Sequence, residues 1–149
     1  MAYNIYLSGE IHTSWRTEII DSVKSEGLDV EFSFPELNHD MSDNCGSVIL
    51  GREDDQFWGD HKSSKINFIR TRKLIKEADI VVVRFGENYK QWNAAFDAGY
   101  SVALNKSLIV IHSEENRHAL KEVDAMALAV LSKPSEVSKL LKYVVEGSL

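Results

Sequence analysis

The sequence has few of the residues that mark several classes of protein. It has one cysteine, Cys45, in 149 residues, which excludes an internal disulfide framework and fits a reducing cytoplasm. With 2 Pro and 8 Gly it does not favour a loop-dominated all-β architecture. Its 17 Lys and Arg against 23 Asp and Glu leave a net charge of −6, which argues against non-specific binding of duplex nucleic acid. The longest apolar runs, near Ile80–Val83 and Leu108–Ile111, are far too short to span a bilayer.

The remaining composition is that of an ordinary globular protein, with 44% hydrophobic and 27% charged residues. The length suits one domain, residues 1–149, whose hydrophobic core is large enough to be stable without disulfides or structural metals. Met1–Tyr6 lacks the basic and then apolar pattern of a signal peptide. We therefore expect a single cytoplasmic domain.

Strand-like and helix-like segments alternate along the chain. Short apolar segments predict five strands, over Asn4–Leu7, Leu28–Phe34, Asp79–Phe85, Ser107–His112 and Leu128–Leu131. Helices are predicted over residues 14–26, Ser63–Glu77, Gln91–Asn105, Glu115–Met126 and Pro134–Val145. Glu36–Asp60 shows no clean period, so we expect a long loop there, with one or two helical turns near Asp43–Leu50. The alternation predicts an α/β fold, a flavodoxin-like three-layer sandwich whose five-stranded parallel sheet has the order 2-1-3-4-5.

Ligands of such sheets bind beyond the carboxyl ends of the strands, at the point where the strand order reverses. For the predicted order that point lies between the first and third strands. The loops that reach it are Ser8–Arg16, the segment after Pro35, and Gly86–Asn93. Polar side chains are denser in these loops than at the opposite ends of the strands, so we place the candidate site here.

The first of these loops has features of an anion site. Gly9 allows the backbone to approach a ligand closely. Ser8, Thr13 and Ser14 precede a helix N-terminus, and together they could hold an anion such as phosphate. Arg16 could supply the matching positive charge. The alternative is that Thr13 or Ser14 only caps the helix and Arg16 is solvated. The spacing matches neither a Walker loop nor G-x-G-x-x-G, so it indicates neither a nucleoside triphosphatase nor a dehydrogenase.

The second segment contains Asn38, His39 and Asp40. The adjacent His39 and Asp40 would suit a metal, but a metal site needs three or four ligands and no second cluster appears at helical spacing. Turn formation or recognition of a polar ligand is favoured, and we expect no metal.

The helix predicted over Gln91–Asn105, which follows the third loop, carries a carboxylate, Asp97, among small and apolar neighbours. Burial in such surroundings raises the pKa of a carboxyl unless a partner offsets it, and such groups serve as nucleophiles or as general acids and bases. Asn93 lies on the same helix face. Trp92 is by default a core residue, and its place next to the proposed cleft leaves stacking on a base as the alternative. An equally open alternative is that Asp97 caps a neighbouring loop or pairs with Arg16 or Arg84.

Several stretches resemble a known group of enzymes. Ile5-Tyr6-Leu7-Ser8-Gly9, Ala78-Asp79-Ile80-Val81-Val82 and Ala95-Phe96-Asp97-Ala98-Gly99-Tyr100 are similar to the nucleoside 2-deoxyribosyltransferase-like superfamily. Ser8-Gly9-Glu10-Ile11-His12, Asn38-His39-Asp40 and Gly86-Glu87 through Gln91-Trp92-Asn93 resemble more closely the small bacterial YtoQ family, over nearly the whole chain. The resemblance implies a flavodoxin-like fold and an enzyme that cleaves the N-glycosidic bond of deoxynucleosides or their monophosphates through a helix carboxylate.

The resemblance also implies roles for individual residues. Asp97 takes the place of the nucleophile, where the transferases have Glu, and Tyr6, Ser8 and Gly9 line the sugar or phosphate side. Apart from the resemblance, our hypothesis names Glu10, Glu87 and His39 as candidates to protonate the leaving base. In retaining glycosidases the two carboxyl groups lie about 5 Å apart, a distance that Glu10 or Glu87 could meet with Asp97. The candidate catalytic residues are Asp97, Glu10 and Glu87, and the candidate substrate-binding residues are Tyr6, Ser8, Gly9, His12, Arg16, Asn38, His39, Asp40, Gly86, Trp92 and Asn93.

Three hypotheses follow. The first is an N-glycosidase or 2-deoxyribosyltransferase-like enzyme that needs no cofactor, and the second is a non-catalytic nucleotide-binding or sensing module that uses the same cleft. The third is an assembly protein with Glu36–Asp60 at a subunit interface. We expect a small nucleoside-like or nucleotide-like ligand, no nucleic-acid polymer or membrane as a partner, and a homo-oligomer.

Overall fold

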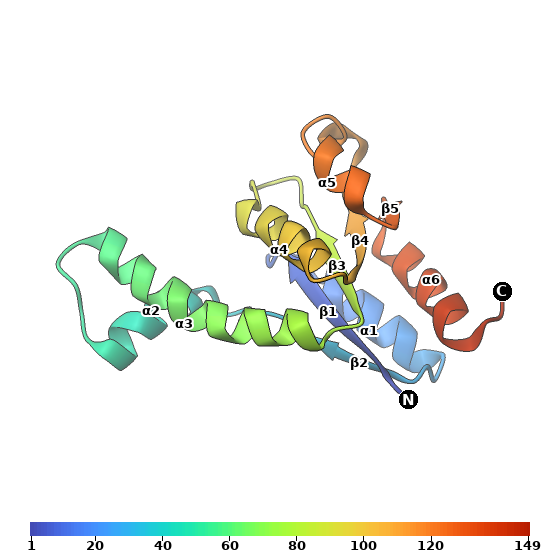
Figure 1. The fold of residues 1–149 in the computed structure, drawn as a ribbon, viewed down its shortest axis with the longest axis horizontal. Coiled ribbons are helices and arrows are strands. Elements are labelled where there is room, and N and C mark those ends of the chain that lie inside the picture. The colour runs from blue at the N-terminus through green and yellow to red at the C-terminus, as the bar shows by residue number, and fades with distance from the viewer.

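The computed structural model describes residues 1–149 and contains one five-stranded parallel sheet in the order β2-β1-β3-β4-β5 (Figure 1). The strands are β1 (Tyr3–Gly9), β2 (Val30–Ser33), β3 (Ile80–Arg84), β4 (Ser107–Ile111) and β5 (Ala129–Leu131). The α-helices are α1 (Trp15–Ser25), α2 (His39–Leu50), α3 (Gln56–Glu77), α4 (Trp92–Ala103), α5 (Lys121–Met126) and α6 (Pro134–Glu146). The predicted fold class and strand order are confirmed.

Side chains that alternate along the strands divide the core into two layers. Ile5 and Leu7 of β1 pack with α1 and α6 on one face of the sheet. Tyr6 of β1 packs on the other face, with α3 and α4. Because both faces are covered, the central strand β3 is buried at four successive residues, Ile80–Val83.

The prediction of a long loop over Glu36–Asp60 is wrong. Residues His39–Leu50 form α2, and α3 begins at Gln56 rather than at Ser63. The two helices form a hairpin that projects from the sheet (Figure 1). Of the residues in α2 only Gly46 is buried, so this helix has no periodic apolar stripe, and such a stripe is the feature by which sequence predicts a helix.

The helix predicted over Glu115–Met126 is also shorter than expected. A 3-10 turn covers Glu114–Asn116, and α5 begins only at Lys121. The residues between them are mostly exposed, so no apolar face is available to pack that part as a helix. No helix of the structure has the length and the apolar character required to cross a membrane.

Candidate active site

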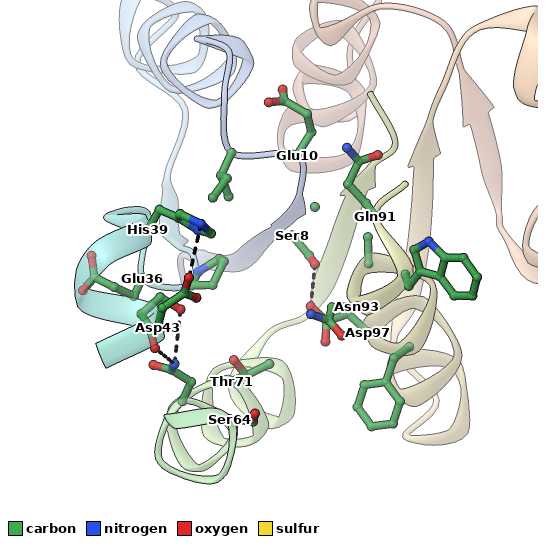
Figure 2. A pocket seen from close by; sticks show the side chains of 18 of the residues that line it. Ser8, Glu10, Glu36, His39, Asp43, Ser64, Thr71, Gln91, Asn93 and Asp97 are labelled. Atoms are coloured by element: carbon green, nitrogen blue, oxygen red, sulfur yellow. Dashed lines mark hydrogen bonds and ion pairs between the residues drawn. The ribbon is translucent and has the colours of Figure 1, made fainter. Parts of the chain in front are cut away.

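A cleft of about 1010 Å³ opens beyond the carboxyl end of β1, between the α2–α3 hairpin and the N-terminal half of α4 (Figure 2). It lies at the edge of the sheet where the strand order reverses. Most of the residues that line it are polar. Among the predicted residues, it is lined by Ser8, Gly9, Glu10, His12, His39, Trp92, Asn93 and Asp97. Its volume is sufficient for a nucleoside-sized molecule.

Asp97 and Ser8 face each other across the junction of α4 and β1 (Figure 2). The Ser8 hydroxyl donates a hydrogen bond of 2.6 Å to Oδ2 of Asp97. Burial raises the pKa of Asp97 to about 6, and the bond from Ser8 opposes that rise. Asp97 forms neither of the ion pairs with Arg16 or Arg84 that the sequence left open, because Arg84 pairs with Glu87 and Arg16 is used elsewhere.

Tyr6 lies below this pair, fully buried under α3 and α4, and does not line the cleft. Its hydroxyl makes no hydrogen bond of ordinary geometry, although the Thr71 side chain lies near enough to favour the ionised form of the phenol. Burial, and next the negative charge of Asp97, raise the pKa of Tyr6, so the phenol stays neutral.

Glu10 is held by the turn that leads into α1. Its carboxylate accepts hydrogen bonds from the backbone N–H groups of His12 and Thr13 and, at 2.5 Å, from the Thr13 hydroxyl. In Figure 2 this carboxylate points away from Asp97. Burial alone would raise the pKa of Glu10, but these hydrogen bonds outweigh it and lower the pKa, so Glu10 is poorly suited to donate a proton.

Arg16 does not reach the cleft, although the sequence suggested it as a phosphate ligand. Its guanidinium is buried and donates to the backbone carbonyls of Leu7, Gly9 and Glu10. Burial lowers the pKa of Arg16 to about 10, and the group remains charged at neutral pH. Arg16 therefore stabilises the backbone at the end of β1 and does not bind a ligand in the cleft.

Two glycines of the predicted site are needed for close packing. Gly9 has φ of +106°, and a Cβ there would lie 2.0 Å from the carbonyl oxygen of Arg84. A Cβ on Gly86 would lie 2.5 Å from Cγ of Glu10. Gly86 and Glu87 line a small neighbouring cavity, not the main cleft.

The α2–α3 hairpin forms the opposite wall. His39 pairs with Asp43 at 3.2 Å, and both side chains line the cleft (Figure 2). Asn38 accepts a hydrogen bond from the backbone N–H of Met41 and caps α2, while the exposed Asp40 lies in its first turn. Neither Asn38 nor Asp40 lines the cleft.

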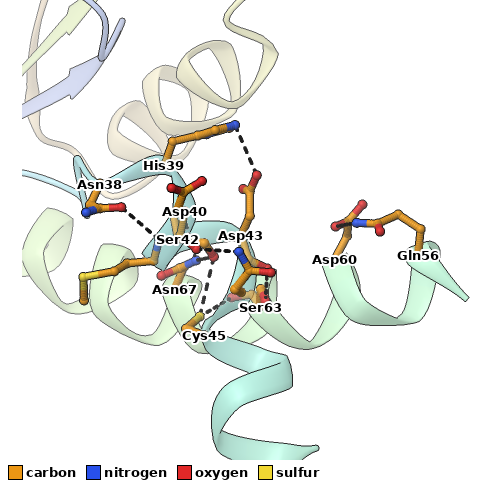
Figure 3. Close-up of polar contacts among 12 residues, drawn as sticks. Asn38, His39, Asp40, Ser42, Asp43, Cys45, Gln56, Asp60, Ser63 and Asn67 are labelled. Atoms are coloured by element: carbon orange, nitrogen blue, oxygen red, sulfur yellow. Dashed lines mark hydrogen bonds and ion pairs between the residues drawn. The ribbon is translucent and has the colours of Figure 1, made fainter. Parts of the chain in front are cut away.

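The hairpin is joined through small and polar residues (Figure 3). Ser63 donates to the carbonyl of Asp43 at 2.6 Å and accepts from the N–H of Gly46 at 3.0 Å. Asn67 donates to the carbonyl of Ser42 at 2.8 Å. These bonds hold the wall that carries His39.

The cleft is also lined by one face of α3, which was not predicted from the sequence. Ser63, Asn67 and Thr71 line the cleft from three successive turns of this helix. Their spacing of four residues places small polar groups in one stripe, and that stripe was the available signal.

Aromatic side chains border the cleft beside Asp97. Trp92 and Phe96 lie one turn apart on α4, and Phe68 of α3 meets Phe96 edge to face at 5.8 Å. Trp92 is 73% exposed, so its ring is accessible for stacking. No group of three or more His, Cys, Asp or Glu comes together in the geometry of a metal site.

Comparison with known proteins agrees with this architecture. The profile of the family described as nucleoside 2-deoxyribosyltransferase YtoQ matches residues 6–145. The chain is 43% identical over 146 residues to the protein described as uncharacterised YtoQ of Bacillus subtilis (strain 168), covering 98% of this chain and 99% of that protein.

Solved structures share the fold at low sequence identity. A conserved protein from Enterococcus faecalis V583 has a TM-score of 0.65 at 11% identity, over 97% of this chain and 99% of that one. A 2-deoxyribosyltransferase from Bacillus psychrosaccharolyticus has a TM-score of 0.58 at 17% identity, over 91% of this chain and 90% of that one. With the family match over nearly its whole length, the chain belongs to the YtoQ family of nucleoside 2-deoxyribosyltransferase-like proteins.

Proposed function

We propose that this protein cleaves the N-glycosidic bond of a nucleoside-like substrate, as a hydrolase or a transferase, with Asp97 as the nucleophile. The observation that carries the proposal is the Asp97 carboxyl, which has a raised pKa, no ion-pair partner and a place on the wall of a nucleoside-sized cleft. Perturbed carboxyl groups in clefts are typical of catalytic sites. Family membership and the shared fold of a 2-deoxyribosyltransferase support the same chemistry.

The reaction has two displacements at the anomeric carbon. One Asp97 oxygen bonds to C1′ as the C1′–N bond breaks, and the electron pair stays on the base nitrogen, which takes up a proton. Water or a second base then attacks C1′, loses a proton and releases Asp97, so the configuration is retained. The hydrogen bond from Ser8 engages Oδ2 and leaves Oδ1 for the attack.

We assign to His39 the role of the acid that protonates the leaving base. Of the three candidates from the sequence, Glu10 is held by backbone N–H groups and Glu87 lies outside the main cleft. His39 lines the cleft, with its Nε2 against Asp43 and its Nδ1 without a partner. The aromatic border formed by Trp92, Phe96 and Phe68 suits the base.

A screen by liquid chromatography and mass spectrometry tests the proposal. Wild type, Asp97→Asn and Asp97→Glu are incubated with deoxynucleosides, ribonucleosides and their monophosphates, with and without an acceptor base. Wild type is expected to release free base and Asp97→Asn to lose at least about a thousandfold in rate, because the nucleophile is removed. Asp97→Glu tests whether the carboxylate of the transferases is tolerated here.

Two outcomes would contradict the proposal. Equal turnover by wild type and Asp97→Asn would remove Asp97 from the chemistry. No turnover of any substrate, with equal ligand affinity in both proteins, would leave the nucleotide-binding or sensing module as the function.

We also propose that the protein is a homo-oligomer that buries the tip of the α2–α3 hairpin. Five large apolar side chains are exposed there, Val48, Ile49, Leu50, Phe57 and Trp58, and an apolar cluster of this kind is typical of a protein interface. Light scattering of wild type and of a Val48→Glu, Trp58→Glu variant tests it. A monomeric wild type would refute it.

A further inference from the structure

We infer that a second copy of this chain docks on the outer face of α3 in antiparallel orientation, with the acidic loop of each hairpin against the basic half of α3 in the other copy. The outer face is defined by Trp58, Lys65, Ile69, Arg72 and Lys76. This mode of docking rests on the homo-oligomer proposed above and adds the surface that receives the hairpin tip. It is independent of the glycosidic reaction.

The outer face is exposed and has no partner within one chain. Its residues follow one another at spacings of three, four and seven, so they form a single stripe along the helix. The helix α2 packs on the opposite side, where Ser63 and Asn67 donate to its backbone carbonyls, and Ile75 packs against the sheet. Because α3 runs from the hairpin tip back to the sheet (Figure 1), the stripe from Trp58 to Lys76 is about 27 Å long.

Two large apolar side chains on this stripe are in contact with water. Trp58 is 52% exposed and Ile69 is 72% exposed. Phe57 lies beside Trp58, meets its ring edge to face at 5.0 Å and is also exposed. Burial of such side chains against another protein surface is favourable, so a solvated face does not explain them.

The charges of the hairpin are separated by sign along its length. The loop between α2 and α3 has three carboxylates, Glu53–Asp55, and one arginine, whereas the outer face of α3 has Lys65, Arg72 and Lys76. None of these three cations forms an ion pair within the chain, and neither does Asp54. Charges of this kind also offset a helix dipole, but that effect is confined to the first and last turns, and Lys65 and Arg72 lie outside them.

A two-fold axis across the middle of α3 brings the unlike charges together twice. If Trp58 of one copy lies level with Ile69 of the partner subunit, the loop Glu53–Asp55 lies level with Arg72 of the partner subunit, because antiparallel helices advance by equal steps in opposite directions. The same contact recurs at the other end of the pair. A parallel arrangement would place acidic loop on acidic loop, so charge favours the antiparallel one.

The centre of this arrangement contributes little to the orientation. Lys62 lies there, level with Lys65 of the partner subunit, and Glu53 of its own chain pairs with it at 2.5 Å. The charge of Lys62 is thereby offset, and the long Lys65 side chain can extend into water. The orientation therefore depends on the two ends.

Exchange of charge between the two ends tests this mode of docking. Asp54→Arg, Arg72→Glu and the double variant with both changes are compared with wild type, and sedimentation velocity gives the dissociation constant of the oligomer. Asp54 and Arg72 are about 27 Å apart along one hairpin, so any coupling between them acts between two copies. Asp21→Arg, an exposed charge reversal on α1, is the matched control. Circular dichroism and thermal unfolding check that each variant is folded.

Each single variant is expected to raise the dissociation constant at least about tenfold, because like charges then face each other at both ends. The double variant restores unlike charges and is expected to lie within about threefold of wild type. Asp21→Arg should leave the dissociation constant unchanged.

Single variants that associate like wild type, or a double variant no stronger than the single ones, would overturn this mode of docking. The proposed homo-oligomer would survive both results if wild type associates and the Val48→Glu, Trp58→Glu variant does not. A monomeric wild type would overturn both proposals. Release of free base by the same proteins decides on the glycosidic reaction separately.

Discussion

Replacing Asp97 by Asn is expected to make the folded protein more stable at neutral pH while it removes the nucleophile. Burial raises the pKa of Asp97 in the folded state from 3.8 to about 6. The folded protein therefore holds the Asp97 proton more tightly than the unfolded chain does. The stabilisation from that proton is complete below about pH 4 and is lost as the pH rises to about 6.

The size of the effect follows from the same two pKa values. The interval from 3.8 to about 6 corresponds to at most about 3 kcal/mol of unfolding free energy at pH 7. Asp97 keeps some exposure to water, and the asparagine amide also has a cost of burial, so we expect about 1–2 kcal/mol. For a chain of this length that difference raises Tm by about 2–8 °C.

The assay is urea unfolding of wild type and Asp97→Asn at pH 4, 5, 6, 7 and 8. The gain in stability of the variant should be small at pH 4, grow between pH 4 and pH 6, and stay level above that. Asp21→Asn, an exposed change on α1, is the control and should show less than about 0.5 kcal/mol at every pH. A variant less stable than wild type at pH 7, or a difference that does not change with pH, would refute the reasoning.

Three further predictions follow from the same contacts. The kcat/KM of wild type should fall about tenfold per pH unit below pH 6, because Asp97 must be ionised to attack, and a flat profile from pH 5 to 8 would contradict that role. Ser8→Ala removes the hydrogen bond that favours the Asp97 carboxylate, so the acidic midpoint of the pH profile of kcat/KM should move to higher pH. Ser25→Ala, outside the cleft, should leave this midpoint unchanged. Gly46→Ala brings a Cβ within 2.5 Å of the Ser63 backbone nitrogen and should cost about 1–3 kcal/mol in urea unfolding, whereas Gly99→Ala, where a Cβ meets open space, should not destabilise.

The sequence predicts those elements correctly whose burial produces a regular pattern of apolar residues. Strands such as Ile80–Val83 are covered on both faces and read as continuous apolar runs, and the helices of the main body carry apolar faces. Alternation of these elements, together with the rules of chain connection, was enough for the sheet order and for the edge at which the cleft opens. The rise in the pKa of Asp97 was also predictable, since its neighbours along α4 are small or apolar.

Elements that pack through small residues or backbone groups could not be predicted from the sequence. The helix α2 contacts α3 through Gly46, which leaves no apolar stripe, so its residues were taken for a loop. The polar stripe of α3 that includes Asn67 was not predicted to line the cleft, because small polar residues at this spacing also occur on solvent-facing helix surfaces. Both features can be recognised only in the tertiary structure, where α2 and α3 pack against each other.

The sequence by itself determined the α/β class, the order of the strands, the edge of the sheet that carries the cleft, and Asp97 as its unusual carboxylate. These follow from local hydrophobic periodicity and residue type, which each segment carries on its own. Only the tertiary structure decided how the charged groups near β1 are used, with Arg16 bound to carbonyls and Glu10 to N–H groups. The reason is physical: a charged side chain has several partners within reach, and which of them it meets depends on the backbone that folding brings beside it.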